Sequence, residues 1–121
     1  MGRRSRQRER RVQSELPEPP ATDYRDAEGN ILTLRGSLTA KTRQQYASTL
    51  KGGANREDAW QRATEFLFER LAVSWTISEL ELTGQKELLG RYRVASSDER
   101  RFVRDSLREH LQEHFPELEA P

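Results

Sequence analysis

Apolar residues follow helical spacing in the longest patterned stretch of the chain, residues 57–71. Trp60, Ala63, Leu67 and Leu71 occupy positions i, i+3, i+7 and i+11, which lie on one face of an α-helix. Further apolar residues at positions 59, 66 and 68 widen this stripe to more than half of the helix circumference. The pattern predicts that this helix is the central element of the fold.

Three further helices are marked by local start and stop signals. They are expected at residues 40–50, at residues 85–94 and from residue 96 to residue 115. Thr39 is the expected N-cap of the first, as Asn55 is of the central helix. Ser96 and Glu99 have the spacing of a capping box for the last helix, which ends before Pro116 because proline cannot continue it.

A short β-hairpin is predicted at residues 24–35, ahead of the helices. Gly29-Asn30 supplies the turn signal, and Leu32 and Leu34 alternate with neighbouring positions on the second strand. Two strands alone are marginal in water, so these leucines need a helix to cover them. The predicted fold class is therefore mainly α: a small four-helix domain over residues 22–121 with a short N-terminal β-hairpin.

Residues 73–82 leave two interpretations open. Apolar and polar residues alternate with a period of two from Val73 to Ile77, and Leu80 and Leu82 continue the alternation. This pattern favours either a short strand or an extended connection. Trp75 is expected to fill the core in both cases.

The first 21 residues have the composition of a disordered basic arm. Three prolines break the stretch, and six arginines near its start repel one another. The arginines are Arg3, Arg4, Arg6, Arg8, Arg10 and Arg11. With Glu9 they give the first eleven residues a net charge of +5, so the remaining chain is net −4 within a total of +1. These arginines are candidate phosphate contacts, since flexible guanidinium groups bind phosphates without reading sequence.

Composition excludes several functional classes. Cysteine is absent, which rules out disulfides and cysteine metal sites and fits a reducing cytoplasm. No apolar run has the length that a bilayer requires, so we expect a cytoplasmic protein without membrane contact. No phosphate-binding loop, nucleophile elbow or paired acid and base is present, and we expect no catalytic residues, metal or cofactor.

The two histidines of the chain are part of a motif that needs separate consideration. His110, Glu113 and His114 fit the H-x-x-E-H pattern of inverted zinc proteases, in which the histidines bind zinc and the glutamate activates water. A third ligand is normally well downstream, but only seven residues follow His114. We therefore interpret both histidines as ordinary residues of a terminal helix.

A protein-binding surface is the functional feature that the apolar pattern favours. The stripe on the central helix is wide enough that one edge of it is expected to stay exposed and to contact a partner. The predicted partner-binding residues are Trp60, Ala63, Leu67, Leu71, Leu88 and Tyr92. We accordingly predict a binding module and not an enzyme.

The layout of the chain resembles that of tail assembly chaperones of long-tailed bacteriophages. The resemblance begins at residues 30–43, Asn-Ile-Leu-Thr-Leu-Arg-Gly-Ser-Leu-Thr-Ala-Lys-Thr-Arg, where a strand ending in Leu-x-Leu runs into helices. It continues through an acid-capped helix at residues 57–71, a connection bearing Trp75, a helix at residues 85–92 and a charged last helix ending near Leu118.

This resemblance implies a non-enzymatic role in phage or prophage tail assembly. Several copies would coat the helical tape measure protein in the bacterial cytoplasm, keep it soluble and recruit tail tube proteins. An amphipathic helix of the partner would then lie in an apolar groove. The alternative is a small nucleic-acid-associated regulator that uses the Arg-rich arm for phosphate contacts and its helices to dimerise.

Overall fold

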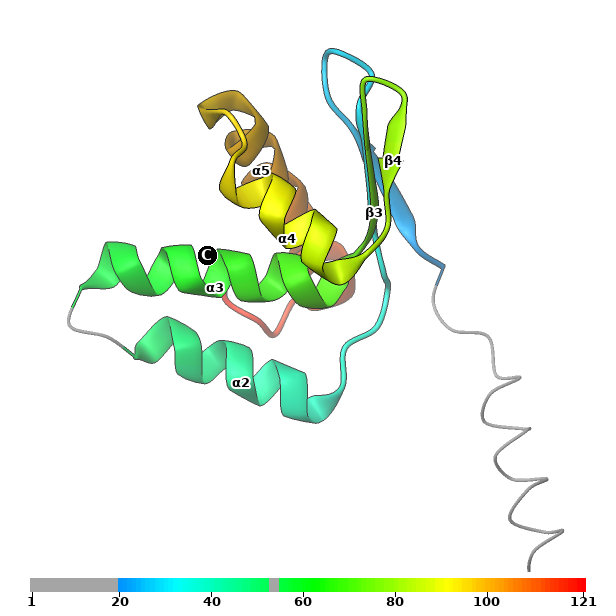
Figure 1. Cartoon of the computed structure of the whole chain (residues 1–121). Helices are drawn as coiled ribbons and strands as arrows, with labels where there is room; N and C mark the ends of the chain where they lie inside the picture. The colour runs from blue at the N-terminus through cyan, green and yellow to red at the C-terminus, as the bar shows by residue number, and fades with distance from the viewer. Residues whose placement is uncertain (1–19, 53–54) are drawn as a thin grey trace, which may run out of the picture.

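A four-stranded antiparallel sheet and four helices make up residues 20–52 and 55–121, the part of the chain that the computed structural model describes (Figure 1). The strands are β1 (Thr22–Arg25), β2 (Ile31–Leu34), β3 (Ala72–Ile77) and β4 (Leu80–Leu82). The helices are α2 (Ala40–Lys51), α3 (Arg56–Leu71), α4 (Gln85–Arg93) and α5 (Ser97–His114). The predicted basic arm, with its six arginines, lies outside the described residues apart from positions 20 and 21.

The first hairpin lies where the sequence predicts it. Tyr24 of β1 is the register partner of Leu32 of β2, and Gly29 adopts a φ of 84° in the turn between the two strands. The carboxylate of Asp26 accepts hydrogen bonds from the backbone N–H groups of Glu28 and Asn30, both at 2.9 Å, which closes the turn. The local turn chemistry is therefore sufficient to define this hairpin.

The predicted fold class, mainly α with a single hairpin, is wrong because residues 72–82 form a second hairpin. β3 pairs with both β2 and β4, so the sheet has the order β1-β2-β3-β4 and the fold combines helices with a complete sheet. Its turn, Ser78-Glu79, places two non-glycine residues at φ values of 49° and 68°. Such a turn has the dihedral sign of a type I′ hairpin without its usual asparagine or glycine, so the sequence carries no turn signal there.

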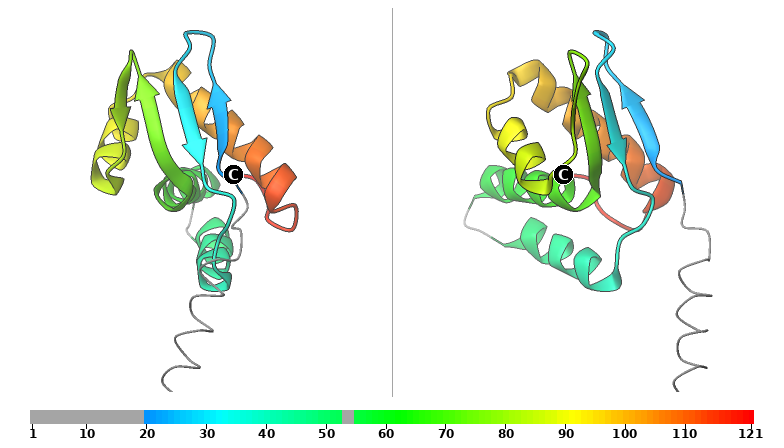
Figure 2. Two further views of the ribbon diagram at one scale, coloured as in Figure 1. Left: turned by 90° about the vertical axis from the view of Figure 1, so that its right-hand side faces the viewer. Right: turned by 45° about the vertical axis from the view of Figure 1, so that its right-hand side comes forward.

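Helices α4 and α5 cover one face of the sheet, whereas α2 packs against α3. Figure 2 shows α4 behind β3 and β4, and α5 behind β1 and β2. The covered face contributes Leu32, Leu34 and Trp75 to the core, where each is at most 1% exposed. The opposite face carries polar pairs such as Asp23 and Thr33, whose side chains hydrogen bond at 2.6 Å. The molecule is thus a two-layer structure with one solvated sheet face.

The four predicted helices are present, and their caps are those that the sequence indicates. Thr39 accepts a hydrogen bond from the N–H of Thr42, and Asn55 accepts one from the N–H of Glu57. Both hydrogen bonds of the Ser96–Glu99 capping box are formed. α2 packs against α3, and its buried residue is Tyr46.

The Ser78-Glu79 turn gives a stability prediction. Replacing Glu79 by glycine should raise the free energy of unfolding by about 0.5–1 kcal/mol, because glycine adopts the left-handed conformation without the steric cost of a Cβ atom. Part of this gain in stability is offset, because glycine has more conformational freedom than glutamate in the unfolded chain. Urea unfolding of E79G measures the change. The matched control is E28G in the other turn, where φ is not positive and glycine should not stabilise; a loss of stability in E79G would contradict the prediction.

Candidate binding cleft

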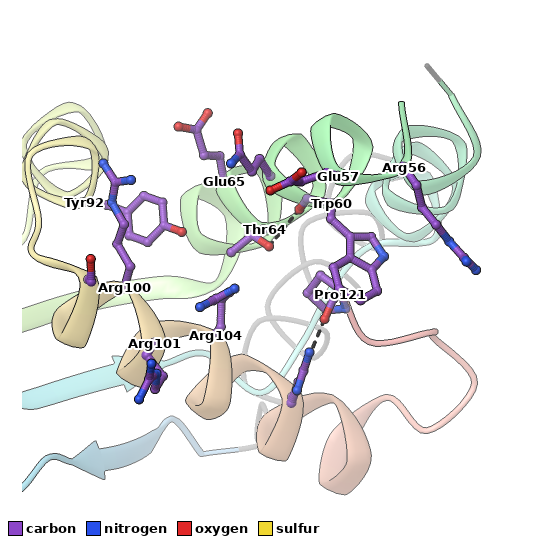
Figure 3. A pocket seen from close by; sticks show the side chains of 13 residues that line it. Arg56, Glu57, Trp60, Thr64, Glu65, Tyr92, Arg100, Arg101, Arg104 and Pro121 are labelled. Atoms are coloured by element: carbon purple, nitrogen blue, oxygen red, sulfur yellow. Dashed lines mark hydrogen bonds between the residues drawn. The ribbon is translucent and has the colours of Figure 1, made fainter. Parts of the chain in front are cut away.

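A cavity of about 800 Å³ lies between α3 and α5 (Figure 3). Residues of α3 form one wall and residues of α5 the other, while Tyr92 of α4 and Pro121 also line it. The complete lining consists of Arg56, Glu57, Trp60, Gln61, Thr64, Glu65, Tyr92, Ser97, Arg100, Arg101, Arg104, Arg108 and Pro121. We call this cavity the arginine cleft.

The α5 wall carries a row of arginines. Arg100, Arg104 and Arg108 are spaced by four residues, so they follow one another along one side of the helix at intervals of about 6 Å. Val103 and Leu107 lie on the buried side of α5, where neither has measurable exposure. Because this apolar side is fixed against the core, the arginine row is directed into the cleft.

Among the residues that the structure describes, basic side chains outnumber acidic ones in the lining of the cleft. Five arginines and two glutamates line it, a local balance of +3. Among the described residues, the salt bridges are made by Arg43, Arg62, Arg91 and Arg93, none of which lines the cleft. Glu65 already contacts Arg93, at 3.3 Å, so one of the two acids faces a cation outside the row. The arginine row therefore retains its capacity to bind carboxylate or phosphate groups.

Two aromatic residues add apolar surface to the cleft. Trp60 is 43% exposed, which is unusual for a residue of this size on the central helix. Tyr92 is buried, and its ring stacks on Phe68 with centroids 5.1 Å apart. Its hydroxyl points into the cleft in Figure 3. Burial raises the pKa of Tyr92, although the nearby guanidinium groups of Arg100 and Arg104 oppose this effect.

The predicted partner-binding residues divide into two groups. Ala63, Leu67, Leu71 and Leu88 are at most 2% exposed, because the core of helices and sheet covers them. Their side chains are therefore not available to a partner in this structure. Trp60 and Tyr92 are brought together at the arginine cleft. Of the apolar edge predicted from the sequence, only Trp60 is exposed. The apolar stripe gives no indication of the polar residues that line the cleft.

The arginines on the α5 wall of the cleft were not predicted from the sequence. They are Arg100, Arg101, Arg104 and Arg108. Their four-residue spacing opposite an apolar stripe is visible in the sequence, but a solvated helix face has the same pattern. A cleft wall differs from a solvated helix face only because α3 lies across the cavity from these arginines. The arginines at positions 3–11, predicted as phosphate contacts, lie outside the described residues.

His110 has a structural role. Its ring is fully buried; Nε2 donates a hydrogen bond to the carbonyl oxygen of Arg35 at 2.8 Å, and Nδ1 accepts one from the Tyr24 hydroxyl at 2.9 Å. Both ring nitrogens are therefore engaged, which leaves neither for a metal ion. In the described part of the chain, no cluster of three or more histidine, aspartate or glutamate side chains has the geometry of a metal site.

Comparison with known proteins gives no relative from which a function could be transferred: no family model, curated protein or solved structure matches the chain. Within residues 20–52 and 55–121, none of the helices has the length and apolar character needed to cross a bilayer. The arginine cleft is therefore the feature of this protein from which a function can be inferred.

The contacts of His110 predict how stability depends on pH. Burial lowers its pKa below the ordinary 6.5, an effect that the hydrogen bond to Arg35 partly opposes. The unfolded chain therefore binds a proton more readily than the folded chain below pH 6.5. The contribution of His110 is complete above that pH and is lost as the pH falls, with a slope of at most about 1.4 kcal/mol per pH unit.

Urea unfolding of the wild type and of H110Q between pH 7 and pH 5.5 measures this dependence. Glutamine does not titrate, so the difference in unfolding free energy between wild type and variant should shrink as the pH falls. A difference that is independent of pH would contradict the assignment of a neutral, buried His110.

Proposed function

We propose that this protein is a non-enzymatic binding module that holds an acidic segment of a partner protein in the arginine cleft. The observation that carries the proposal is the row of Arg100, Arg104 and Arg108 opposite the exposed Trp60, a row that forms no salt bridge with an acidic side chain within residues 20–52 and 55–121. Arginine and tryptophan are the residue types that contribute most to binding energy at protein interfaces. Their placement on two packed helices holds the site in a fixed geometry.

Net charge favours a protein segment over nucleic acid as the ligand. Residues 22–121 contain fifteen basic and seventeen acidic residues, a net charge of −2. A long polyanion would meet this acidic remainder of the surface, whereas a short acidic segment within the cleft interacts mainly with the local charge of +3. A segment with carboxylates at four-residue helical spacing would also match the arginine row.

The resemblance to tail assembly chaperones suggests a specific partner, the tape measure protein. Its long amphipathic helix would place an acidic stripe on the arginine row of α5 and an apolar residue against Trp60. Several copies along the helix would keep it soluble and recruit tail tube subunits, as the family does. This proposal differs from the groove expected from the apolar stripe, because the core already covers Leu67 and Leu71.

A hexaglutamate peptide with an N-terminal fluorophore tests the site by fluorescence anisotropy. We expect R104Q to weaken binding about three- to tenfold, because a charge-assisted contact is lost at a partly solvated position. The matched control is R62Q on the outer side of α3, where Arg62 pairs with Asp58 at 3.2 Å and does not line the cleft. Equal effects of the two substitutions would contradict the proposal.

The same assay with a single-stranded oligonucleotide separates the two functional classes. Protein binding predicts that the peptide is preferred at moderate salt and that deletion of residues 1–11 leaves its affinity unchanged. A nucleic-acid regulator predicts the reverse: tight oligonucleotide binding that falls steeply with salt and is lost with those residues. That second result would contradict the proposed protein-binding function and support the nucleic-acid regulator instead.

The tape measure partner has a test of its own. A fragment of the long helical protein encoded nearest to this gene should be retained by the immobilised full chain and should be lost from W60A. Retention by W60A at the wild-type level would place the interaction elsewhere on the molecule.

A further inference from the structure

Residues 116–121 return from the end of α5 to the arginine cleft. Phe115 ends the helix, and a turn follows in which the N–H of Leu118 donates to the carbonyl oxygen of Phe115 at 3.0 Å. The chain then turns back past α2 toward α3, as the red segment of Figures 1 and 2 shows. We call residues 116–121 the closing segment.

Contacts with α2 and the core hold the closing segment in place. Arg43 forms a salt bridge with Glu117 at 2.7 Å, and the buried hydroxyl of Tyr46 donates a hydrogen bond to the main-chain oxygen of Glu119. Leu118 and Ala120 pack against the core and are partly buried. The salt bridge has side chains that are 40% and 52% exposed, so it adds little to the stability of this arrangement.

The last residue of the closing segment lies in the cleft itself. Pro121 is buried, and its main-chain oxygen accepts a hydrogen bond from Nε of Arg108 at 3.2 Å (Figure 3). Arg108 is therefore already bound to an oxygen atom of the closing segment, while Arg100 of the same row donates to the carbonyl oxygen of Arg93 at 2.5 Å. Glu117 and Glu119 of the same segment do not line the cleft, so Pro121 is the residue through which the segment occupies it.

We infer that the closing segment is an internal competitor for the arginine cleft, and that a bound acidic partner displaces residues 119–121. This inference rests on the proposed function of the cleft. Displacement frees Arg108 and extends the cleft toward α2, at the cost of the Tyr46 and Arg108 hydrogen bonds. The turn between Phe115 and Leu118 stays in place and serves as the hinge.

Competition lowers the apparent affinity of the partner by the fraction of molecules whose cleft is open. A chain that ends at Leu118 should therefore bind the labelled hexaglutamate peptide more tightly than the full chain, by about three- to tenfold. Tyr46→Phe removes a single hydrogen bond to the segment and keeps the ring in the core. It should tighten binding by a smaller factor, about twofold.

Nuclear magnetic resonance on the full chain provides a readout that does not depend on variant stability. On saturation with the peptide, the backbone amide signals of Glu119 and Ala120 should move to the positions of an unstructured chain. Those of Leu107 and Leu111 in the core should stay in place.

Two outcomes overturn the inference, and only the second also contradicts the proposed function of the cleft. If the full and shortened chains bind the peptide equally, and the Glu119 and Ala120 signals remain unchanged, the closing segment is a fixed wall and the cleft remains the binding site. If neither chain binds the peptide, the proposed function fails and the competitor fails with it.

Discussion

The edge-to-face contact between Phe68 and Trp75 joins the central helix to the centre of the sheet. Their ring centroids lie 5.7 Å apart, and Tyr92 of α4 also stacks on Phe68, with centroids 5.1 Å apart. Only three residues separate Leu71, the end of α3, from Trp75, because β3 follows the helix without a loop. The burial of these rings thus fixes the helix, the strand and α4 relative to one another.

The position of the arginine cleft follows from this core. α3 and α5 each direct an apolar side toward the sheet, so their polar sides border the same cavity. The capping box at Ser96 and Glu99 fixes the start of α5, and the buried Val103 and Leu107 fix its rotation. Within the part of the chain that the structure describes, the arginine row consequently forms no salt bridge with an acidic side chain. A cavity with excess positive charge is therefore a property of the fold, and its ligand must supply the negative charge.

Much of the local structure could be predicted from the sequence, because it depends on short-range chemistry. The Asn55 cap, the Ser96 capping box and the Gly29 turn are each defined within a few residues. The second hairpin could not be predicted from local chemistry, since Ser78 and Glu79 adopt left-handed conformations without a glycine or asparagine, and the N–H of Ser78 donates to the distant Oδ1 of Asn30 at 3.0 Å. The cleft depends on which side of α3 the other elements cover, and the stripe gives Trp60 and Leu67 the same pattern although only Leu67 is buried.

The indole N–H signals of the two tryptophans test the role of the cleft most directly. Trp60 borders the arginine row, whereas Trp75 is 1% exposed in the core. Titration of the full chain with an acidic peptide should shift the Trp60 indole signal in a saturable manner and leave the Trp75 signal unchanged. Binding of the peptide without any shift of the Trp60 signal would contradict the account.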